Sequence, residues 1–448
     1  MSTIIAQATP SGESALAVVR ISGELCLQIA NDACSYNCPP PRLAKVANYQ
    51  DINGNIIDQV VITYFEAGKS YTGQQSLEIS CHGNPLICQL LCEDLLKRGC
   101  RIAQPGEFTK LAFLNGKIDL SQAESVAQII SSKNLLSLAA AQRNLKGDLS
   151  QQLITIQEEI LELQASIEAY IDFPEDDLGL NDQSIQVKLS ESILANLTSL
   201  LDQASKTKIL QKKIRVVLIG LPNAGKSSLF NHIAGEKRAL IHEDAGTTRD
   251  YLEMEVQVGK HSVLIVDTAG VHNTDSQVEK AGVRLSHEQA GKADIILWII
   301  DSSIPHPTNL PSEFESILET KPTIFVQNKS DLNSQEKTPL NIELPKQRIS
   351  CKNKEGIEEL LGKLSDLITE IYGEESDQIL LIGQRHEQLI TLCQKEVEKF
   401  IANLKDNVGL EIISKYLTSA REYIDEMIGT KTNENMLDKL FGQFCIGK

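Results

Sequence analysis

Hydrophobic and polar positions change their spacing along the chain, and these changes divide it into regions. From residue 1 to about 118, short apolar runs alternate with turns rich in Gly, Pro and Asn. The runs LAVVRISG, QVVITYFEAG and SLEISCHGNP have the length and composition of strands bounded by turns. We therefore expect residues 1–118 to form an α+β domain.

After residue 118 the apolar positions recur every three or four residues, which is the period of an amphipathic helix. This pattern continues to about residue 212, and Pro174 in IDFPEDD should end one long helix. The same period returns after residue 376. One predicted apolar face there consists of Leu389, Cys393, Val397, Phe400, Ile401 and Leu404. Residues 119–212 and 377–448 are thus both predicted to be helical.

Between residues 213 and 376, strands alternate with helices. The predicted strands are IRVVLIG, HSVLIVD, DIILWIID, PTIFVQN and QRIS. This alternation predicts an α/β sheet with mostly parallel strands. Neither flanking helical stretch has a complete set of packing partners alone. We therefore expect one discontinuous helical domain with the α/β domain inserted into it.

Composition limits the classes of function. A net charge of -17 over 448 residues disfavours a broad face that grips nucleic acid, although a local patch or a basic partner could do so. No signal-peptide pattern precedes residue 30, and the longest apolar run, Ile295–Ile300, is too short to span a bilayer. The ten cysteines form no Cys-x-x-Cys pair. We expect most thiols to be buried in a reducing, cytoplasmic compartment.

The segment GLPNAGKSS (Gly220–Ser228) follows the predicted strand RVVLI and matches the P-loop pattern G-x-x-x-x-G-K-[ST]. Its glycines allow backbone N–H groups to close around phosphates. Lys226 can reach the β- and γ-phosphates, and the hydroxyl of Ser227 can hold Mg²⁺. The pattern in this context predicts a nucleoside triphosphate site.

Three further motifs follow in order. In DTAG (Asp267–Gly270), Asp267 would support Mg²⁺ and the Gly270 N–H would contact the γ-phosphate, while Thr248 in AGTTRD would complete the Mg²⁺ shell. Asp331 in NKSD can accept two hydrogen bonds from guanine, a pattern that adenine does not match. These motifs predict a GTPase. The predicted GTP contacts are Asn223, Ala224, Gly225, Lys226, Ser227, Ser228, His242, Glu243, Asp244, Ala245, Gly246, Thr247, Thr248, Asp267, Thr268, Ala269, Gly270, Asn328, Lys329, Asp331, Ser350, Cys351 and Lys352.

The residue that orients the attacking water is not the usual glutamine. Val271 occupies the position after the Asp-x-x-Gly segment, and an apolar side chain cannot polarise water. Asp275 and Glu279 are candidates for this role, and a solvated loop charge is the alternative for each. Arg249 could act as an arginine finger or form a surface ion pair.

Asn223 stands directly before AGKSS, and GTTRD follows further along the chain. This combination of motifs resembles the tRNA modification GTPase family called MnmE or TrmE. The resemblance extends over the whole chain. Its other landmarks are IIAQATPSGESALAVVRISG, SYTGQQSLEISCHGNP, PGEFTKLAFLNGKIDLSQAE, AYIDFPEDD and FCIGK. It implies three domains: a folate-binding-like α+β dimerisation domain (1–118), a discontinuous helical domain (119–212 and 377–448) and an inserted α/β P-loop, Ras-like GTPase domain (213–376).

The resemblance also implies a potassium-dependent mechanism. Asn223 is expected to coordinate K⁺ beside the phosphates, together with oxygens from a loop that contains His242, Asp244 and Thr247. Such a K⁺ would offset charge that develops between the phosphates, and dimerisation of two GTPase domains would shield it and activate hydrolysis. Glu279 corresponds to the family's water-orienting glutamate, which favours it over Asp275.

The N-terminal region resembles tetrahydrofolate-binding domains of the glycine-cleavage type. This resemblance implies that Arg20, Glu78, Lys117 and Lys448 contact 5-formyltetrahydrofolate, an analogue of 5,10-methylenetetrahydrofolate. A carboxylate suits the amidine edge of a pterin, and Arg or Lys suits the glutamate of the folate. Composition alone would make these residues ordinary surface charges.

The tail FCIGK could be a prenylation box, but Lys448 is a poor last residue for one and no polybasic run precedes it. The segment MLDKLFGQF (Met436–Phe444) instead predicts a docked helix end that releases Cys445 into a loop. In the resembling family this tail reaches the folate site. Cys445 is therefore a candidate catalytic thiol.

The family works as a homodimer and forms a heterotetramer with the FAD-dependent glucose-inhibited-division protein (MnmG, also called GidA). Together they are expected to add an aminomethyl or carboxymethylaminomethyl group to C5 of the wobble uridine of certain tRNAs. A tetrahydrofolate one-carbon unit and ammonium or glycine would supply the atoms, and GTP hydrolysis would drive a conformational cycle. Two other classes stay open: a ribosome-assembly GTPase and a membrane-anchored signalling GTPase.

Overall fold

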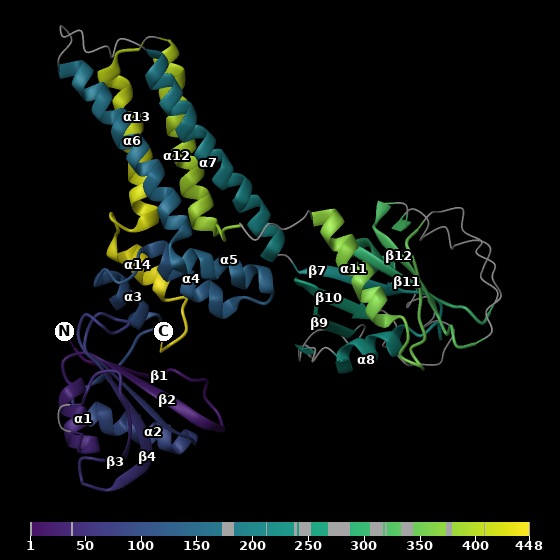
Figure 1. Ribbon diagram of the computed structural model, residues 1–448, viewed down its shortest axis with the longest axis horizontal. Coiled ribbons are helices and arrows are strands. Elements are labelled where there is room, and N and C mark those ends of the chain that lie inside the picture. The colour runs from purple at the N-terminus through teal and green to yellow at the C-terminus, as the bar shows by residue number, and fades with distance from the viewer. Residues whose placement is uncertain are drawn as a thin grey trace. The chain divides into compact units, whose positions relative to one another are not determined.

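The chain forms two compact units. The computed structural model describes residues 2–36, 39–172, 183–211, 213–236, 240–241, 252–267, 287–304, 317–318, 320–332, 344–372, 379–406 and 408–447. Unit 1 comprises residues 1–131, 141–202 and 382–448, and unit 2 comprises residues 132–140 and 203–381. Unit 1 thus contains both ends of the chain (Figure 1).

Unit 1 begins with a six-stranded sheet of order β3-β4-β5-β2-β1-β6, antiparallel except for the β1–β6 pair. Its strands are β1 (Ile4–Gln7), β2 (Ser14–Ser22), β3 (Ala44–Gln50), β4 (Ile56–Phe65), β5 (Ser76–Gly83) and β6 (Arg101–Ile102). Helices α1 (Cys26–Cys34) and α2 (Pro85–Lys97) share one apolar core with alternate residues of these strands, such as Val19 and Ile79. The α+β expectation is confirmed.

On the central strands β2 and β5, side chains alternate between the two faces of the sheet, so every second residue points away from the apolar core. Arg20 on β2 is paired in register with Glu78 on β5, and Ser22 is paired with Ser76. Phe108 on the short helix α3 (Glu107–Leu114) lies close to Arg20. This face therefore carries polar groups next to α3.

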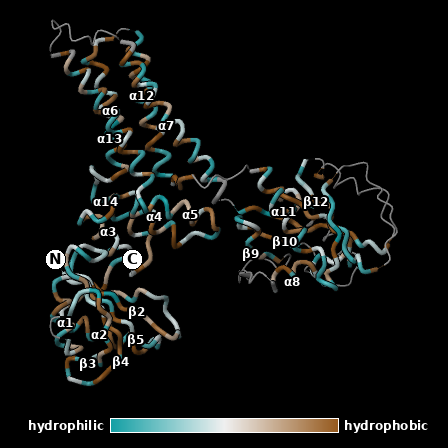
Figure 2. The backbone as a smooth tube through the Cα atoms, viewed as in Figure 1, coloured by the Kyte–Doolittle hydropathy of each residue, from teal (hydrophilic) through white to brown (hydrophobic). Residues whose placement is uncertain are grey.

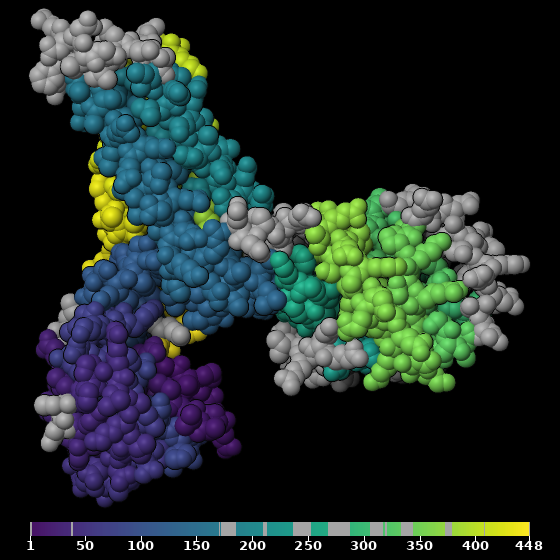
Figure 3. All heavy atoms as spheres, in the orientation of Figure 1, coloured from purple at the N-terminus to yellow at the C-terminus, as the bar shows by residue number. Residues whose placement is uncertain are grey.

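The remainder of unit 1 is helical. Its helices are α4 (Leu120–Ser131), α5 (Leu135–Lys146), α6 (Asp148–Asp172), α7 (Gln183–Gln211), α12 (Gln384–Lys405), α13 (Leu410–Ile428) and α14 (Glu434–Phe441), and parts of α5 and α7 belong to unit 2. Helix α13 from the C-terminal segment packs beside α6 and α12 (Figure 3). Apolar residues recur along these helices (Figure 2). Every residue of the predicted face on α12 is buried. The helical domain is therefore built from two separate segments, as predicted.

Unit 2 contains a seven-stranded sheet of order β13-β12-β11-β7-β10-β9-β8. The strands from β13 to β10 are parallel, and β9 runs antiparallel to β10. The strands are β7 (Ile214–Ile219), β8 (Leu240–Ile241), β9 (Leu252–Val258), β10 (His261–Asp267), β11 (Ile295–Asp301), β12 (Thr323–Asn328) and β13 (Lys346–Arg348). Helices α8 (Lys226–Glu236) and α11 (Ile357–Tyr372) contribute to a core on one face.

This arrangement confirms the α/β prediction and places the carboxyl ends of β7, β10, β11 and β12 along one edge, where ligands bind in parallel sheets. Among the described helices, none combines the length and the apolar run needed to cross a membrane.

Candidate functional site

The loop after β7 adopts a conformation that only glycine tolerates at two positions. Gly220 has φ of +153°, and a Cβ there would lie 2.2 Å from the carbonyl oxygen of Ile299. A Cβ on Gly225, where φ is +100°, would lie 2.0 Å from the side-chain nitrogen of Asn328. The loop is therefore pressed against β11 and the residue that ends β12, and its backbone encloses a space where phosphates can bind.

Lys226 begins α8 and folds back across this loop. Its Nζ donates to the carbonyl oxygens of Gly220 at 2.8 Å and Leu221 at 3.0 Å, and only 7% of the residue is exposed. Burial lowers the pKa of Lys226, whereas the charge of Asp267 partly opposes that shift. A phosphate group would supply the negative charge that a buried ammonium requires, and the N-terminus of α8 would add backbone donors.

Two of the residues expected to support Mg²⁺, Asp267 and Ser227, lie at the same edge of the sheet, whereas Thr248 is outside the described residues. Asp267 is the last residue of β10 and is fully buried, and β10 is parallel to β7, which leads into the P-loop. Ser227 is exposed in the first turn of α8. Hydroxyl and carboxylate oxygens are ligands that Mg²⁺ prefers. The donor set in the described residues therefore fits this ion.

The predicted base-binding motifs are joined by hydrogen bonds. Asn328 donates through Nδ2 to the carbonyl of Ala224 at 2.8 Å and accepts at Oδ1 from the Cys351 N–H at 3.3 Å. Ser350 Oγ donates to Asp331 Oδ1 at 2.7 Å. This hydrogen bond is the main cause of the lowered pKa of Asp331, which keeps its carboxylate ionised. The structure thus brings together the P-loop, NKSD and SCK.

Sequence reasoning missed one residue of this site, Asp301. Its Oδ2 lies 2.5 Å from Nζ of Lys329, and its Oδ1 accepts hydrogen bonds from the Ser303 N–H and Oγ at 2.9 and 2.6 Å. Burial raises the pKa of Asp301, but the bonds from Lys329 and Ser303 outweigh this effect and lower it. Lys329 has φ of +62°, an unusual value for a residue with a side chain. The signal that could have identified Asp301 is its position as an acid at the end of β11, the strand next to β12.

Several predicted positions lie outside the described residues. They are His242, Glu243, Asp244, Ala245, Gly246, Thr247, Thr248, Thr268, Ala269, Gly270, Glu279 and Lys448, together with the alternatives Arg249, Val271 and Asp275 and the helix-ending Pro174.

A second group of predicted residues lies on the polar face of the N-terminal sheet. Arg20 Nε and Nη2 each lie 2.9 Å from Oε1 of Glu78. The guanidinium carbon is 5.9 Å from the centre of the Phe108 ring, and Nη1 donates to the carbonyl of Gly447 at 3.3 Å. Arg20 therefore connects the sheet, α3 and the C-terminal tail.

Lys117 contacts the loop between β4 and β5. Its Nζ donates to the carbonyl of Gly68, in the loop of residues 66–73 between β4 and β5. That loop is tied to the polar face because Thr72 Oγ1 lies 2.7 Å from Ser22 Oγ, and Asn115 Nδ2 donates to the Thr72 carbonyl at 2.7 Å. Lys117 and the Arg20–Glu78 pair are thus linked through one loop.

The C-terminal tail reaches this face because α14 docks on unit 1. Phe441 is buried together with Leu120 and Leu437, and it lies 5.3 Å from Phe444, ring centre to ring centre. The Gly106 N–H then donates to the carbonyl of Cys445 at 3.4 Å. The helix end is the one predicted from MLDKLFGQF, and it brings Cys445 and Gly447 to the region of Arg20.

Cys445 differs from most of the described cysteines in its exposure. Burial raises the pKa of Cys26, Cys34, Cys81 and Cys393 to about 12, so these thiols stay protonated at neutral pH. The Cys445 residue is exposed. Reaction with a substrate is therefore open to Cys445, whereas the buried thiols serve as small apolar side chains.

Comparison with known proteins gives consistent matches over the whole chain. The family model "MnmE helical domain" matches residues 120–445, and the model "GTP-binding protein TrmE N-terminus" matches residues 3–117. Proteins named tRNA modification GTPase MnmE from Opitutus terrae and Aquifex aeolicus are each 37% identical, over 100% and 99% of this chain and 99% of their own length. The Thermotoga maritima protein of that name is 36% identical over 100% of both chains.

Proposed function

The chain belongs to the MnmE family of tRNA modification GTPases, and we propose that it supports addition of an aminomethyl or carboxymethylaminomethyl group to C5 of the wobble uridine of certain tRNAs. The observation that carries this proposal is the docking of the C-terminal tail. A GTP-binding domain alone would need no tail whose Gly447 carbonyl accepts a hydrogen bond from Arg20. The tail brings an exposed thiol to a second, polar site.

In the GTPase domain, the P-loop and the base motifs would bind different parts of the nucleotide. Lys226 and the backbone of residues 223–228 would bind the phosphates, while Ser227, Asp267 and Thr248 would hold Mg²⁺. Asp331 would accept two hydrogen bonds from guanine, and Ser350 holds its carboxylate in position. The remaining predicted contacts would line the same pocket.

For hydrolysis, we assign Glu279 to hold the attacking water. A K⁺ ion coordinated by Asn223 and by the loop of His242, Asp244 and Thr247 would supply positive charge between the β- and γ-phosphates. Asn223 has φ of +64°, so its backbone turns sharply within the P-loop. Two GTPase domains would enclose this region, which makes hydrolysis depend on dimerisation.

In the N-terminal domain, the polar face would bind 5,10-methylenetetrahydrofolate. Glu78 would accept hydrogen bonds from the pterin, and Arg20 would hold the Glu78 carboxylate in its orientation. Lys117 and Lys448 would bind carboxylates of the folate. Cys445 would act next to the one-carbon unit, as a nucleophile or as a proton carrier.

The proposed assembly has three kinds of partner. The chain would form a homodimer through its N-terminal domain and a heterotetramer with the FAD-dependent glucose-inhibited-division protein. With a net charge of -17, the chain would leave much of the tRNA contact to that partner. Its substrates, GTP and tRNA, favour a cytoplasmic location, and no membrane partner is proposed.

Reconstitution tests this function. The purified chain, the flavin protein, 5,10-methylenetetrahydrofolate, ammonium and unmodified tRNA are combined with GTP or with a non-hydrolysable analogue. We expect the C5 substituent to form only with GTP. Equal product with the analogue would contradict a role for hydrolysis, and absence of product with all components present would favour the ribosome-assembly alternative.

A further inference from the structure

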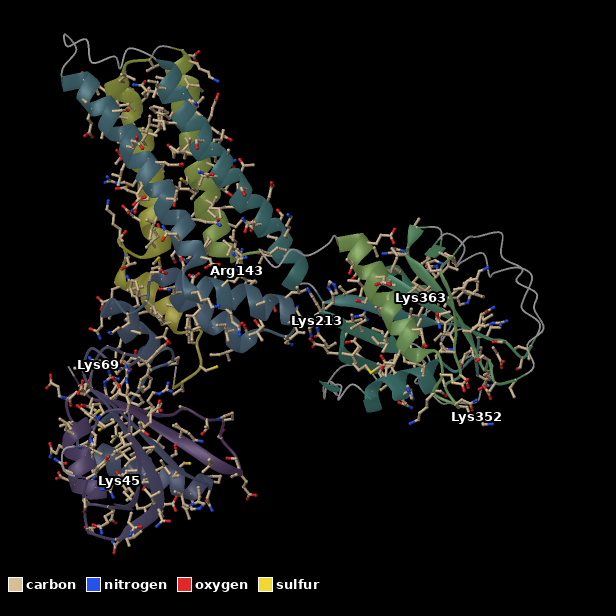
Figure 4. All side chains as sticks on the ribbon, viewed as in Figure 1. Lys45, Lys69, Arg143, Lys213, Lys352 and Lys363 are labelled. Atoms are coloured by element: carbon tan, nitrogen blue, oxygen red, sulfur yellow. The ribbon has the colours of Figure 1, made fainter. Side chains whose placement is uncertain are left out.

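Three cations gather around the loop of residues 66–73. Arg42 Nη2 donates to the carbonyl of Lys69 at 2.9 Å, and Lys117 Nζ donates to the carbonyl of Gly68. These carbonyls belong to neighbouring residues, whose Cα atoms are about 3.8 Å apart. Lys69 lies at the end of the sheet nearer to α3 and adds a third charge (Figure 4). We call Arg42, Lys69 and Lys117 the loop cation cluster.

The loop cation cluster has an excess of positive charge. Among the described residues, Glu66 is the one carboxylate within ion-pair distance of it, with Oε2 3.0 Å from Lys69 Nζ. The side chains of Lys69 and Glu66 are 65% and 41% exposed. One carboxylate for three cations is notable in a chain with net charge -17. The cluster is therefore suited to an anion that arrives from solvent.

The cluster lies beside the proposed folate site. Ser22 follows Arg20 by two residues on β2, a separation of about 6.6 Å along the strand. Ser22 Oγ contacts Thr72 in the loop at 2.7 Å, and the Gly68 N–H donates to the Gly73 carbonyl at 2.8 Å. The loop thus folds back on itself. Two of its carbonyls, those of Gly68 and Lys69, accept the hydrogen bonds from Lys117 and Arg42, so the cluster and Ser22 contact the same loop.

We propose that the loop cation cluster binds the γ-linked glutamates of a polyglutamylated tetrahydrofolate. The inference rests on the proposed folate site, in which Glu78 takes the pterin and Lys117 takes the first glutamate. The pterin and the glutamates lie at opposite ends of a folate, and each added glutamate brings one more carboxylate. Arg42 and Lys69 are placed next to Lys117 for these additional carboxylates.

Arg42 and Lys117 have more N–H donors than their hydrogen bonds to the loop use. A guanidinium has five N–H donors and an ammonium has three. The hydrogen bonds to the loop carbonyls use one donor each from Arg42 and Lys117 and fix where the charges lie. A tRNA backbone would need a longer stripe of cations, whereas three cations on one loop suit a short flexible chain of carboxylates.

Calorimetric titration compares 5-formyltetrahydrofolate carrying one glutamate with the form carrying five, using the full chain in 50 mM salt. Each exposed ion pair is worth up to about fivefold in affinity. With Arg42 and Lys69 both engaged, we expect the pentaglutamate to bind about tenfold more tightly than the monoglutamate. The difference should shrink in 0.5 M salt because the Debye length falls below about 5 Å.

The double variant Arg42→Gln/Lys69→Gln keeps polar side chains and removes two charges. It should bind the monoglutamate normally and lose the preference for the pentaglutamate. The charge-matched control Lys45→Gln/Lys97→Gln changes two exposed lysines of the same domain and should retain the preference.

Equal affinity of the unmodified chain for the two forms would overturn the inference, as would a double variant that weakens both forms equally. Weaker tRNA binding by the double variant, with the folate preference unchanged, would assign the cluster to phosphate contacts instead. Failure of both folates to bind the unmodified chain would remove the folate site itself and this inference with it.

Discussion

The hydroxyl of Ser350 donates a hydrogen bond to Asp331 at 2.7 Å, and the two residues come from different loops at the edge of the same sheet. The bond lowers the pKa of Asp331 and leaves the carboxylate as an ionised acceptor. Guanine presents two donors to such a carboxylate. In the proposed function, the pair would therefore select guanine over adenine.

Replacing Asp331 by Asn should change the base that binds. An amide can accept only one of the two hydrogen bonds from guanine, but it can donate to the C2 carbonyl of xanthine. Fluorescence titration should show GTP binding weakened on the order of 100-fold or more, together with a gain in affinity for xanthosine triphosphate. Ser350→Ala should weaken GTP without favouring xanthosine triphosphate. Unchanged discrimination in Asp331→Asn would mean that another group binds the base.

Replacing Gly106 by Ala should detach the tail. A Cβ at Gly106 would lie 2.5 Å from the Phe441 carbonyl oxygen and 3.0 Å from Cβ of Phe444. The displaced tail would lose the bond from the Gly106 N–H to Cys445. We expect tRNA modification to fail while GTP hydrolysis by the purified chain continues.

Gly116→Ala is a matched control for this variant. Gly116 has φ of +64°, close to the +65° of Gly106, but nothing lies within 4 Å of its added Cβ. Both variants therefore carry a similar backbone strain of about 1 kcal/mol, and only Gly106→Ala moves the tail. Equal loss of modification in both variants would show that strain, not tail position, is responsible.

The buried imidazole of His386 should make stability depend on pH. Its Nε2 lies 3.0 Å from Ser121 Oγ and 3.2 Å from Arg385 Nη2, and Glu124 Oε2 lies 3.2 Å from Nδ1. Burial lowers the pKa of His386 to about 4, and Arg385 adds to this effect while Glu124 opposes it.

Because the pKa of His386 is lower in the folded state, the unfolded chain binds a proton first as pH falls. The stability that neutral His386 supports is fully present above pH 6.5 and is lost between pH 6.5 and 4, by up to about 3 kcal/mol. Urea denaturation of the full chain at a series of pH values should show this loss in the unfolding of unit 1. His386→Gln should flatten that part of the curve, and parallel curves for the two proteins would refute the assignment.

Replacing Glu279 by Ala should separate GTP binding from hydrolysis. Loss of a group that holds the attacking water typically slows a reaction by about 10²–10⁴, whereas the nucleotide contacts stay in place. Single-turnover assays in K⁺ buffer measure this effect. Asp275→Ala, the alternative acid in the same segment, should hydrolyse GTP at a near-normal rate. Slow hydrolysis by Asp275→Ala together with normal hydrolysis by Glu279→Ala would assign the attacking water to Asp275 instead.

The sequence predicted those parts of the fold in which local pattern and packing agree. The apolar face on α12 was found because its helical period reflects one buried side, and the strands β7, β10, β11 and β12 were found because continuous apolar runs reflect burial on both faces of a sheet. Strand β9 was missed although Leu252, Met254, Val256 and Val258 alternate with polar residues, because the strands expected in this domain were continuous apolar runs. Glu255 is nevertheless buried and is bound by Ser262 and Lys213, contacts that arise only when the sheet has formed.

Motifs predicted which residues meet in the GTPase domain, because each motif is a local solution to a phosphate or base contact. Asp301 escaped because its role depends on a partner 28 residues away, Lys329, on a neighbouring strand end. The bond from Arg20 to Gly447 joins residues 427 positions apart. No local pattern encodes such a pair, and the resemblance to the family, rather than the physical pattern, indicated that the tail reaches this face.

The most direct test of the proposed function is mass spectrometry of wobble uridines from cells that lack this protein. We predict that the C5 substituent disappears, that the unmodified chain restores it, and that Cys445→Ser fails to restore it although the purified variant still hydrolyses GTP. Wobble uridines that keep their C5 substituent in the absence of the protein would contradict the account.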